Sequence, residues 1–93
     1  MQDINICGRI WRVVEDGTEH QEGRRGATYK ELQLIRINPS LHQDLKDVTL
    51  VHELLHACAD FVGIEEEKLT EEDWIKRIAP TFTNILKNNN LFI

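Results

Sequence analysis

The segment Asn38-Pro39-Ser40 separates a part of the chain that favours strands from a part that favours helices. This boundary constrains the fold more than any other feature. Residues 3–14 and 28–38, which precede it, are rich in Ile, Val and aromatic side chains and favour strands. A long helix is predicted from about 41 or 44 to 61, where the chain has no glycine or proline. Strands followed by helices predict an α+β fold with a small antiparallel sheet of two or three strands.

A second helix is predicted in the C-terminal third, from about Glu71 to Lys87. Thr70 suits its N-cap, and Asp73 occupies the third helical position of a weak capping box. Apolar side chains recur at helical spacing along it, and Pro80 is expected to kink it. These apolar residues are Ile75, Ile78, Ala79, Phe82, Ile85 and Leu86.

Length and charge narrow the classes of function. A chain of 93 residues suits one domain, 1–93, and its net charge of −5 argues against a nucleic-acid partner. The basic pair Arg24-Arg25 is too short to change that expectation. No apolar run approaches the roughly 18 residues of a membrane span, and no signal peptide is predicted. With Cys7 and Cys58 expected to be reduced, we predict a cytoplasmic protein.

The long helix carries the motif His52-Glu53-x-x-His56. Residues at i and i+4 lie one turn apart on the same helix face, so both imidazoles can reach one tetrahedral zinc ion. Glu53 projects beside the metal, where a general base can take a proton from zinc-bound water. The motif therefore predicts His52 and His56 as zinc ligands and Glu53 as the catalytic base.

A helical wheel predicts how this helix is buried. A broad apolar side should face the core, and the motif residues should share a narrow polar strip with Thr49, Ala59 and Asp60. The apolar side comprises Val48, Val51, Leu54, Leu55, Cys58 and Val62. The alternative is that the polar strip is only the exposed side of an amphipathic helix.

Catalytic zinc usually has three protein ligands, so a third must come from elsewhere in the chain. His42 is too far from His52 along the helix axis, whereas His20 remains a candidate. Glu71 and Glu72, at the start of the last helix, both flank its apolar face. Their alternative role is to interact with the helix dipole.

The segment HELLHACAD resembles the thermolysin-type pattern H-E-L-x-H-A-x-x-D of the gluzincins, through residues 52–60. Size and layout resemble small phage and prophage metallopeptidases related to the ImmA/IrrE type, over roughly residues 28–87. Those peptidases carry a later helix with E-x-x-A-x-x-F-A. In the segment EDWIKRIA, Ile78-Ala79 aligns with F-A and places Glu72 on the ligand position. Ile75 replaces the first Ala, and Lys76 lies where Asn or Asp is frequent. This alignment implies Glu72 as the third ligand.

The resemblance implies a minimal zincin-like domain and a zinc-dependent peptidase acting on a protein or peptide, in a host cytoplasm if the source is a phage. The substrate would be a regulator, extended along a sheet edge formed by residues 28–38. The alternatives are a non-catalytic, zinc-stabilised protein-binding module and a metal-free helical interaction domain. Substrate identity, physiological metal and oligomeric state stay open.

Overall fold

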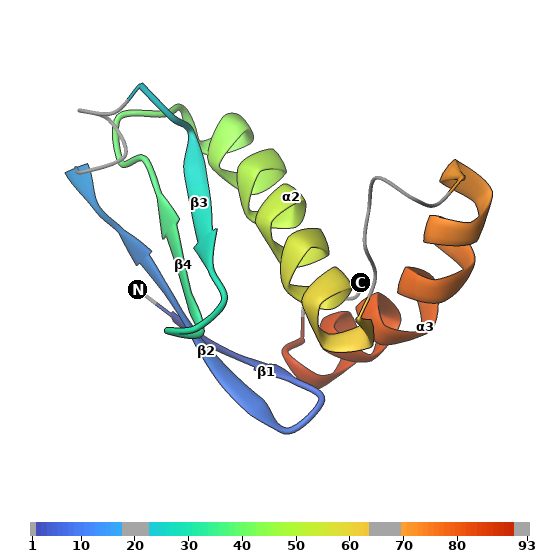
Figure 1. The fold of residues 1–93 in the computed structure, drawn as a ribbon. Helices are drawn as coiled ribbons and strands as arrows, with labels where there is room; N and C mark the ends of the chain where they lie inside the picture. The colour runs from blue at the N-terminus through green and yellow to red at the C-terminus, as the bar shows by residue number, and fades with distance from the viewer. Residues whose placement is uncertain (1, 18–22, 64–69, 91–93) are drawn as a thin grey trace.

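The computed structural model describes residues 2–17, 23–63 and 70–90, and for residues 71, 72 and 75 it describes the backbone alone. These residues form a mixed sheet and two helices, so the predicted α+β class is confirmed (Figure 1). The elements are β1 (Gln2–Ile6), β2 (Arg9–Glu15), β3 (Gly26–Tyr29), β4 (Leu34–Ile37), α2 (Gln43–Val62) and α3 (Glu71–Asn88).

The sheet differs from the prediction in size and in direction. It has four strands in the order β1-β2-β4-β3, not two or three, and it is not wholly antiparallel because β2 pairs with β4 in parallel. After β2 the chain forms β3 at the edge of the sheet. The chain then turns back in a hairpin, and β4 lies between β2 and β3. The predicted edge, residues 28–38, is therefore a hairpin whose first strand alone is the edge.

The predicted single strand over residues 3–14 is a hairpin of β1 and β2. Ile6 pairs with Arg9, which leaves a two-residue turn at Cys7 and Gly8. Both turn residues have positive φ, 51° and 93°, as a tight hairpin of this twist requires. Cysteine rarely adopts such a φ, and a Cys-Gly pair is a weaker turn signal than Asn-Gly, which explains why the sequence reads as one strand.

Both helices follow their predicted limits closely. Helix α2 ends at Gly63, whose φ of 73° gives the left-handed C-cap that glycine favours. Helix α3 begins after Thr70, whose hydroxyl oxygen accepts a hydrogen bond from the Asp73 amide at 3.2 Å. Pro80 lies inside α3. Neither described helix is long and apolar enough to cross a membrane.

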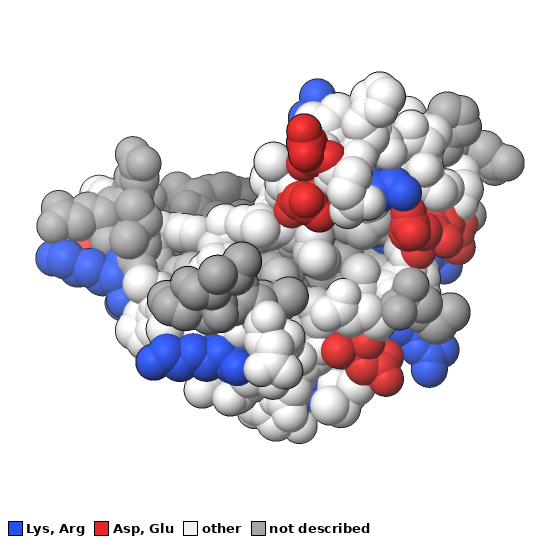
Figure 2. Space-filling view, turned by 180° about the vertical axis from the view of Figure 1, so that it is seen from behind, with Lys and Arg blue, Asp and Glu red and all other residues white. Residues whose placement is uncertain are grey.

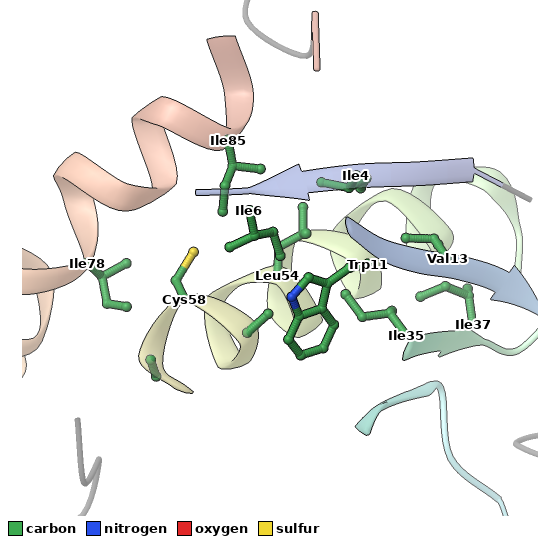
Figure 3. Packing of buried hydrophobic residues seen from close by; sticks show 12 residues of the cluster. Ile4, Ile6, Trp11, Val13, Ile35, Ile37, Leu54, Cys58, Ile78 and Ile85 are labelled. Atoms are coloured by element: carbon green, nitrogen blue, oxygen red, sulfur yellow. The ribbon is translucent and has the colours of Figure 1, made fainter. Parts of the chain in front are cut away.

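The core lies between the sheet and the two helices (Figure 3). Trp11 is its largest fully buried side chain. Cys58 of α2 is also fully buried, and burial raises the pKa of its thiol to about 12. The strands contribute Ile4, Ile6, Trp11, Val13, Ile35 and Ile37, and the helices contribute Leu54, Ala57, Cys58, Ala59, Ile78 and Ile85.

The two helices contact different strands. Helix α2 contacts β3 and β4, whereas α3 contacts α2 and β1, as Figure 1 shows. Asn89, just after α3, joins the β1 edge with its side-chain amide. Its Oδ1 accepts from the Asn5 amide and its Nδ2 donates to the Asn5 carbonyl, both at 3.1 Å. One edge of the sheet is thereby bound to the C-terminal end of α3.

The other edge, β3, approaches α2 unusually closely at Gly26. A Cβ added there would lie 2.7 Å from Thr49 Cγ2 and 2.9 Å from the carbonyl oxygen of Arg36. Both separations are shorter than normal van der Waals contact, and the carbonyl belongs to the backbone of the paired strand. The contact therefore needs a residue without a side chain at position 26.

We expect Gly26→Ala to lower the free energy of unfolding by about 1–3 kcal/mol, because the added methyl overpacks the contact between β3 and α2. Chemical denaturation of the metal-free protein measures this change. Gly17→Ala is the matched control, because no described atom lies within 4 Å of its Cβ and we expect a change within about 0.5 kcal/mol. Equal stabilities of the two variants would contradict the close approach.

Candidate metal centre and its buried carboxylate

Helix α2 brings His52 and His56 together on successive turns. Their Nε2 atoms lie 3.1 Å apart, and their ring centroids lie 4.8 Å apart at an interplanar angle of 72°. His52 is exposed and His56 is half-buried, so solvent and ions reach the pair. The helix therefore presents two imidazole nitrogens that converge on one point, as the i, i+4 spacing predicts.

The separation of these nitrogens suits a tetrahedral metal. Zinc with Zn–N bonds of about 2.0–2.1 Å holds two ligand nitrogens roughly 3.3–3.4 Å apart. The observed 3.1 Å is within a few tenths of an ångström of that value. It also suits a hydrogen bond between one protonated and one unprotonated Nε2, which keeps the pair together without metal. In geometry and donor chemistry, the pair fits two of the ligands of a zinc ion.

Glu53 points in a different direction from the two histidines. It is only 7% exposed, and its carboxylate contacts Thr28 of β3. Thr28 Oγ1 lies 2.8 Å from Glu53 Oε1 and 3.2 Å from the Glu53 carbonyl oxygen. The hydroxyl has one proton, so it donates to one of these oxygens at a time. A buried carboxylate without a donor would be costly, and Thr28 supplies that donor.

The burial of α2 differs from the predicted wheel. Val48 and Val51, which were expected in the core, are 62% and 43% exposed, whereas Thr49 and Glu53 are buried. The side of α2 that carries Thr49 and Glu53 faces β3, where Gly26 leaves room for them. The helix is apolar around most of its circumference, so the wheel alone does not fix which side faces the sheet.

A cavity of about 340 Å³ opens beside the buried carboxylate. His52 and Glu53 both line it, so a ligand in the cavity lies beside a histidine of the converging pair and beside the buried glutamate. The remaining lining residues are Arg24, Arg25, Gly26, Val48 and Thr49. The cavity lies where β3 begins and where the N-terminal half of α2 passes it.

The described side chains do not supply the third ligand. No group of three or more His, Cys, Asp or Glu side chains in that part of the chain is placed to hold a metal ion. His20 and the side chains of Glu71 and Glu72 lie outside it. His42 immediately precedes α2 and is exposed, ten residues or about 15 Å along the helix from His52.

Three residues of the site have no signal in the sequence. Thr28 and Gly26 belong to a strand, and neither forms a recognisable motif with the helix 25 residues later. Thr49 lies one turn before Glu53 on α2 and resembles an ordinary surface residue of the polar strip. Only the packing of β3 on α2 brings them to Glu53. A glycine at a strand start followed by a threonine is too common to have identified them.

Comparison with known proteins adds no relative to this description. No protein-family model matches the chain, and no curated protein or solved structure matches it either. Conclusions about function therefore depend on the geometry and chemistry of the residues themselves.

We expect Thr28→Val to reduce the free energy of unfolding by about 1–3 kcal/mol, because the buried Glu53 carboxylate loses its donor. Thr28→Ser keeps the hydroxyl and should cost about 1 kcal/mol for the lost methyl group. Denaturation of metal-free protein in chelator measures both values. Repeating Thr28→Val in a Glu53→Ala background should reveal a coupling of at least about 0.5 kcal/mol. Equal effects in both backgrounds would show that the two side chains do not interact.

Proposed function

We propose that this chain is a zinc-dependent metallopeptidase, with His52 and His56 as metal ligands and Glu53 as general base. The observation that carries the proposal is the arrangement of three side chains on α2. Two imidazole nitrogens converge at 3.1 Å, and the intervening glutamate lines the same cavity as His52. A structural zinc site has no need of a carboxylate held in this way.

Bound zinc would act as a Lewis acid, polarising the scissile carbonyl and acidifying the attacking water. The remaining roles in this proposal belong to side chains and backbone of the chain. Glu53 accepts a proton from that water through Oε2 and returns it to the leaving amine. Thr28 holds Oε1 and so fixes the carboxylate at the cavity wall. The substrate lies extended along β3, the terminal strand beside α2, and adds a strand to the sheet.

The third ligand in the proposal is Glu72, on the alignment of EDWIKRIA with the E-x-x-A-x-x-F-A pattern. Glu72 lies in the first turn of α3, and Glu71 is the alternative. The resemblance to the ImmA/IrrE type also supplies the proposed substrate class, a regulatory protein cleaved by a small peptidase.

A non-catalytic, zinc-stabilised binding module is the second candidate. The observation that favours it is the hydrogen bond between Thr28 and Glu53, because that bond gives Glu53 a structural role that needs no catalysis. The two candidates share the metal and differ in the consequence of removing the base.

We expect the protein to bind one zinc ion per chain, and the double substitution of His52 and His56 by Ala to abolish binding. Substitution of a residue that hydrogen-bonds to a zinc ligand typically lowers metal affinity roughly 10–100-fold. Glu72→Ala should lower zinc affinity by more than this, and Glu71→Ala should lower it less than Glu72→Ala does. Calorimetric titration measures each affinity. His42→Ala is the control, since that exposed histidine lies outside the site. A wild-type protein that takes up no zinc would exclude the metal centre.

We expect Glu53→Gln to retain the zinc ion and the fold but to lower peptide hydrolysis at least about 100-fold, because the amide cannot accept the proton. Zinc-loaded protein and a quenched fluorescent peptide library provide the assay. Asp47→Asn is the matched control, an exposed carboxylate on the same helix whose loss should leave hydrolysis unchanged. Wild-type activity in Glu53→Gln, or none in the wild type, would favour the binding module.

A further inference from the structure

The cavity beside Glu53 is lined by Arg24 and Arg25, one of two adjacent basic pairs in the sequence, the other being Lys76-Arg77. In a chain of net charge −5, two consecutive arginines thus line the space next to α2. On the face shown in Figure 2, basic side chains lie in several separate groups. The position of the pair at this cavity therefore needs an explanation in terms of what enters it.

The backbone of both arginines is held by one buried residue. Asn38 is 6% exposed, and its Nδ2 donates to the Arg24 carbonyl at 3.2 Å. Its amide donates to the Arg25 carbonyl at 2.8 Å. Asn38 Oδ1 in turn accepts hydrogen bonds from the Ser40 amide and hydroxyl, at 2.9 and 2.7 Å. The two arginines thus emerge from a fixed position immediately before β3.

The chemistry of the cavity walls selects one type of ligand. A guanidinium group has five N–H donors in a planar fork that matches a carboxylate with two parallel hydrogen bonds. Arg25 is exposed, and Arg24 also reaches Tyr29, with Nη2 3.3 Å from the phenol oxygen. Val48, 62% exposed, provides an apolar wall for the methylene groups that precede a carboxylate. A volume of about 340 Å³ is small, enough for a side chain or a chain end.

We propose that this cavity is a substrate subsite that binds a carboxylate of the peptide, with Arg25 as its principal partner and Arg24 as the second. The carboxylate belongs to an acidic side chain near the scissile bond or to the C-terminus of the peptide. This assignment rests on the proposed peptidase function. It makes peptides that carry a carboxylate within reach of this cavity the preferred substrate class of the enzyme.

The test uses one peptide in four forms, with Glu or Gln near the scissile bond and a free or amidated C-terminus. Cleavage by zinc-loaded wild type gives kcat/KM, and anisotropy with zinc-loaded Glu53→Gln protein gives Kd without turnover. For at least one carboxylate form we expect kcat/KM at least about 10-fold higher and Kd at least about 10-fold lower than for the neutral form, with both differences shrinking as salt rises. Comparing the Glu peptide with an amidated C-terminus and the Gln peptide with a free C-terminus shows whether the cavity binds an acidic side chain or the C-terminal carboxylate.

Arg25→Gln should remove most of this preference, measured as the ratio of kcat/KM for the carboxylate form to kcat/KM for the neutral form. Arg12→Gln is the control, because Arg12 is an exposed arginine of β2 outside the cavity. Equal cleavage of all four forms, or a preference unchanged by Arg24→Gln and Arg25→Gln, would overturn the subsite and leave the peptidase standing. Binding of carboxylate forms that depends on Arg25, without any cleavage, would instead support the subsite and overturn the peptidase. Equal binding of all forms would overturn the subsite whether or not cleavage occurs.

Discussion

Strand β3 lies so close to α2 that one carbon atom added at Gly26 would overlap both Thr49 and the backbone of β4. This approach lets Thr28 reach the Glu53 carboxylate, and it forms one wall of the cavity that His52 shares. The strand also begins at the residue that follows Arg25, so the same contact sets where the arginines emerge. The buried carboxylate, the cavity beside it and the placement of the two arginines therefore all depend on a single strand–helix contact.

A domain of this size buries only about 60–65% of its unfolded surface, so polar groups in its interior are a substantial cost. Glu53 and Thr49 occupy buried positions of α2 that aliphatic side chains would fill more favourably. Meanwhile Val48 and Val51 of the same helix face outward. A chain selected for stability alone would have the opposite arrangement. The observed one is the pattern expected where a site, rather than the core, determines which side of a helix faces the sheet.

Local features were predictable from the sequence, and features set by tertiary contacts were not. The limits of α2 and the Thr70 cap of α3 depend on neighbouring residues, and the structure confirms them. The convergence of His52 and His56 follows from helix geometry alone. The parallel pairing of β2 with β4 depends instead on where the chain returns, which no local pattern records. The partnership of Thr28 with Glu53 likewise appears only when segments 25 residues apart are packed together.

The buried Cys58 thiol gives the domain an internal reporter of its own opening. A thiol with a pKa of about 12 is almost wholly protonated at neutral pH, and thiol reagents react with the thiolate. Cys58 lies between the sheet and α3, whereas Cys7 is exposed in the β1–β2 turn. Alkylation should therefore be fast at Cys7 and limited at Cys58 by separation of α3 from α2. The ratio of the two rates therefore reports how often the core around Cys58 opens, with Cys7 of the same molecule as the reference.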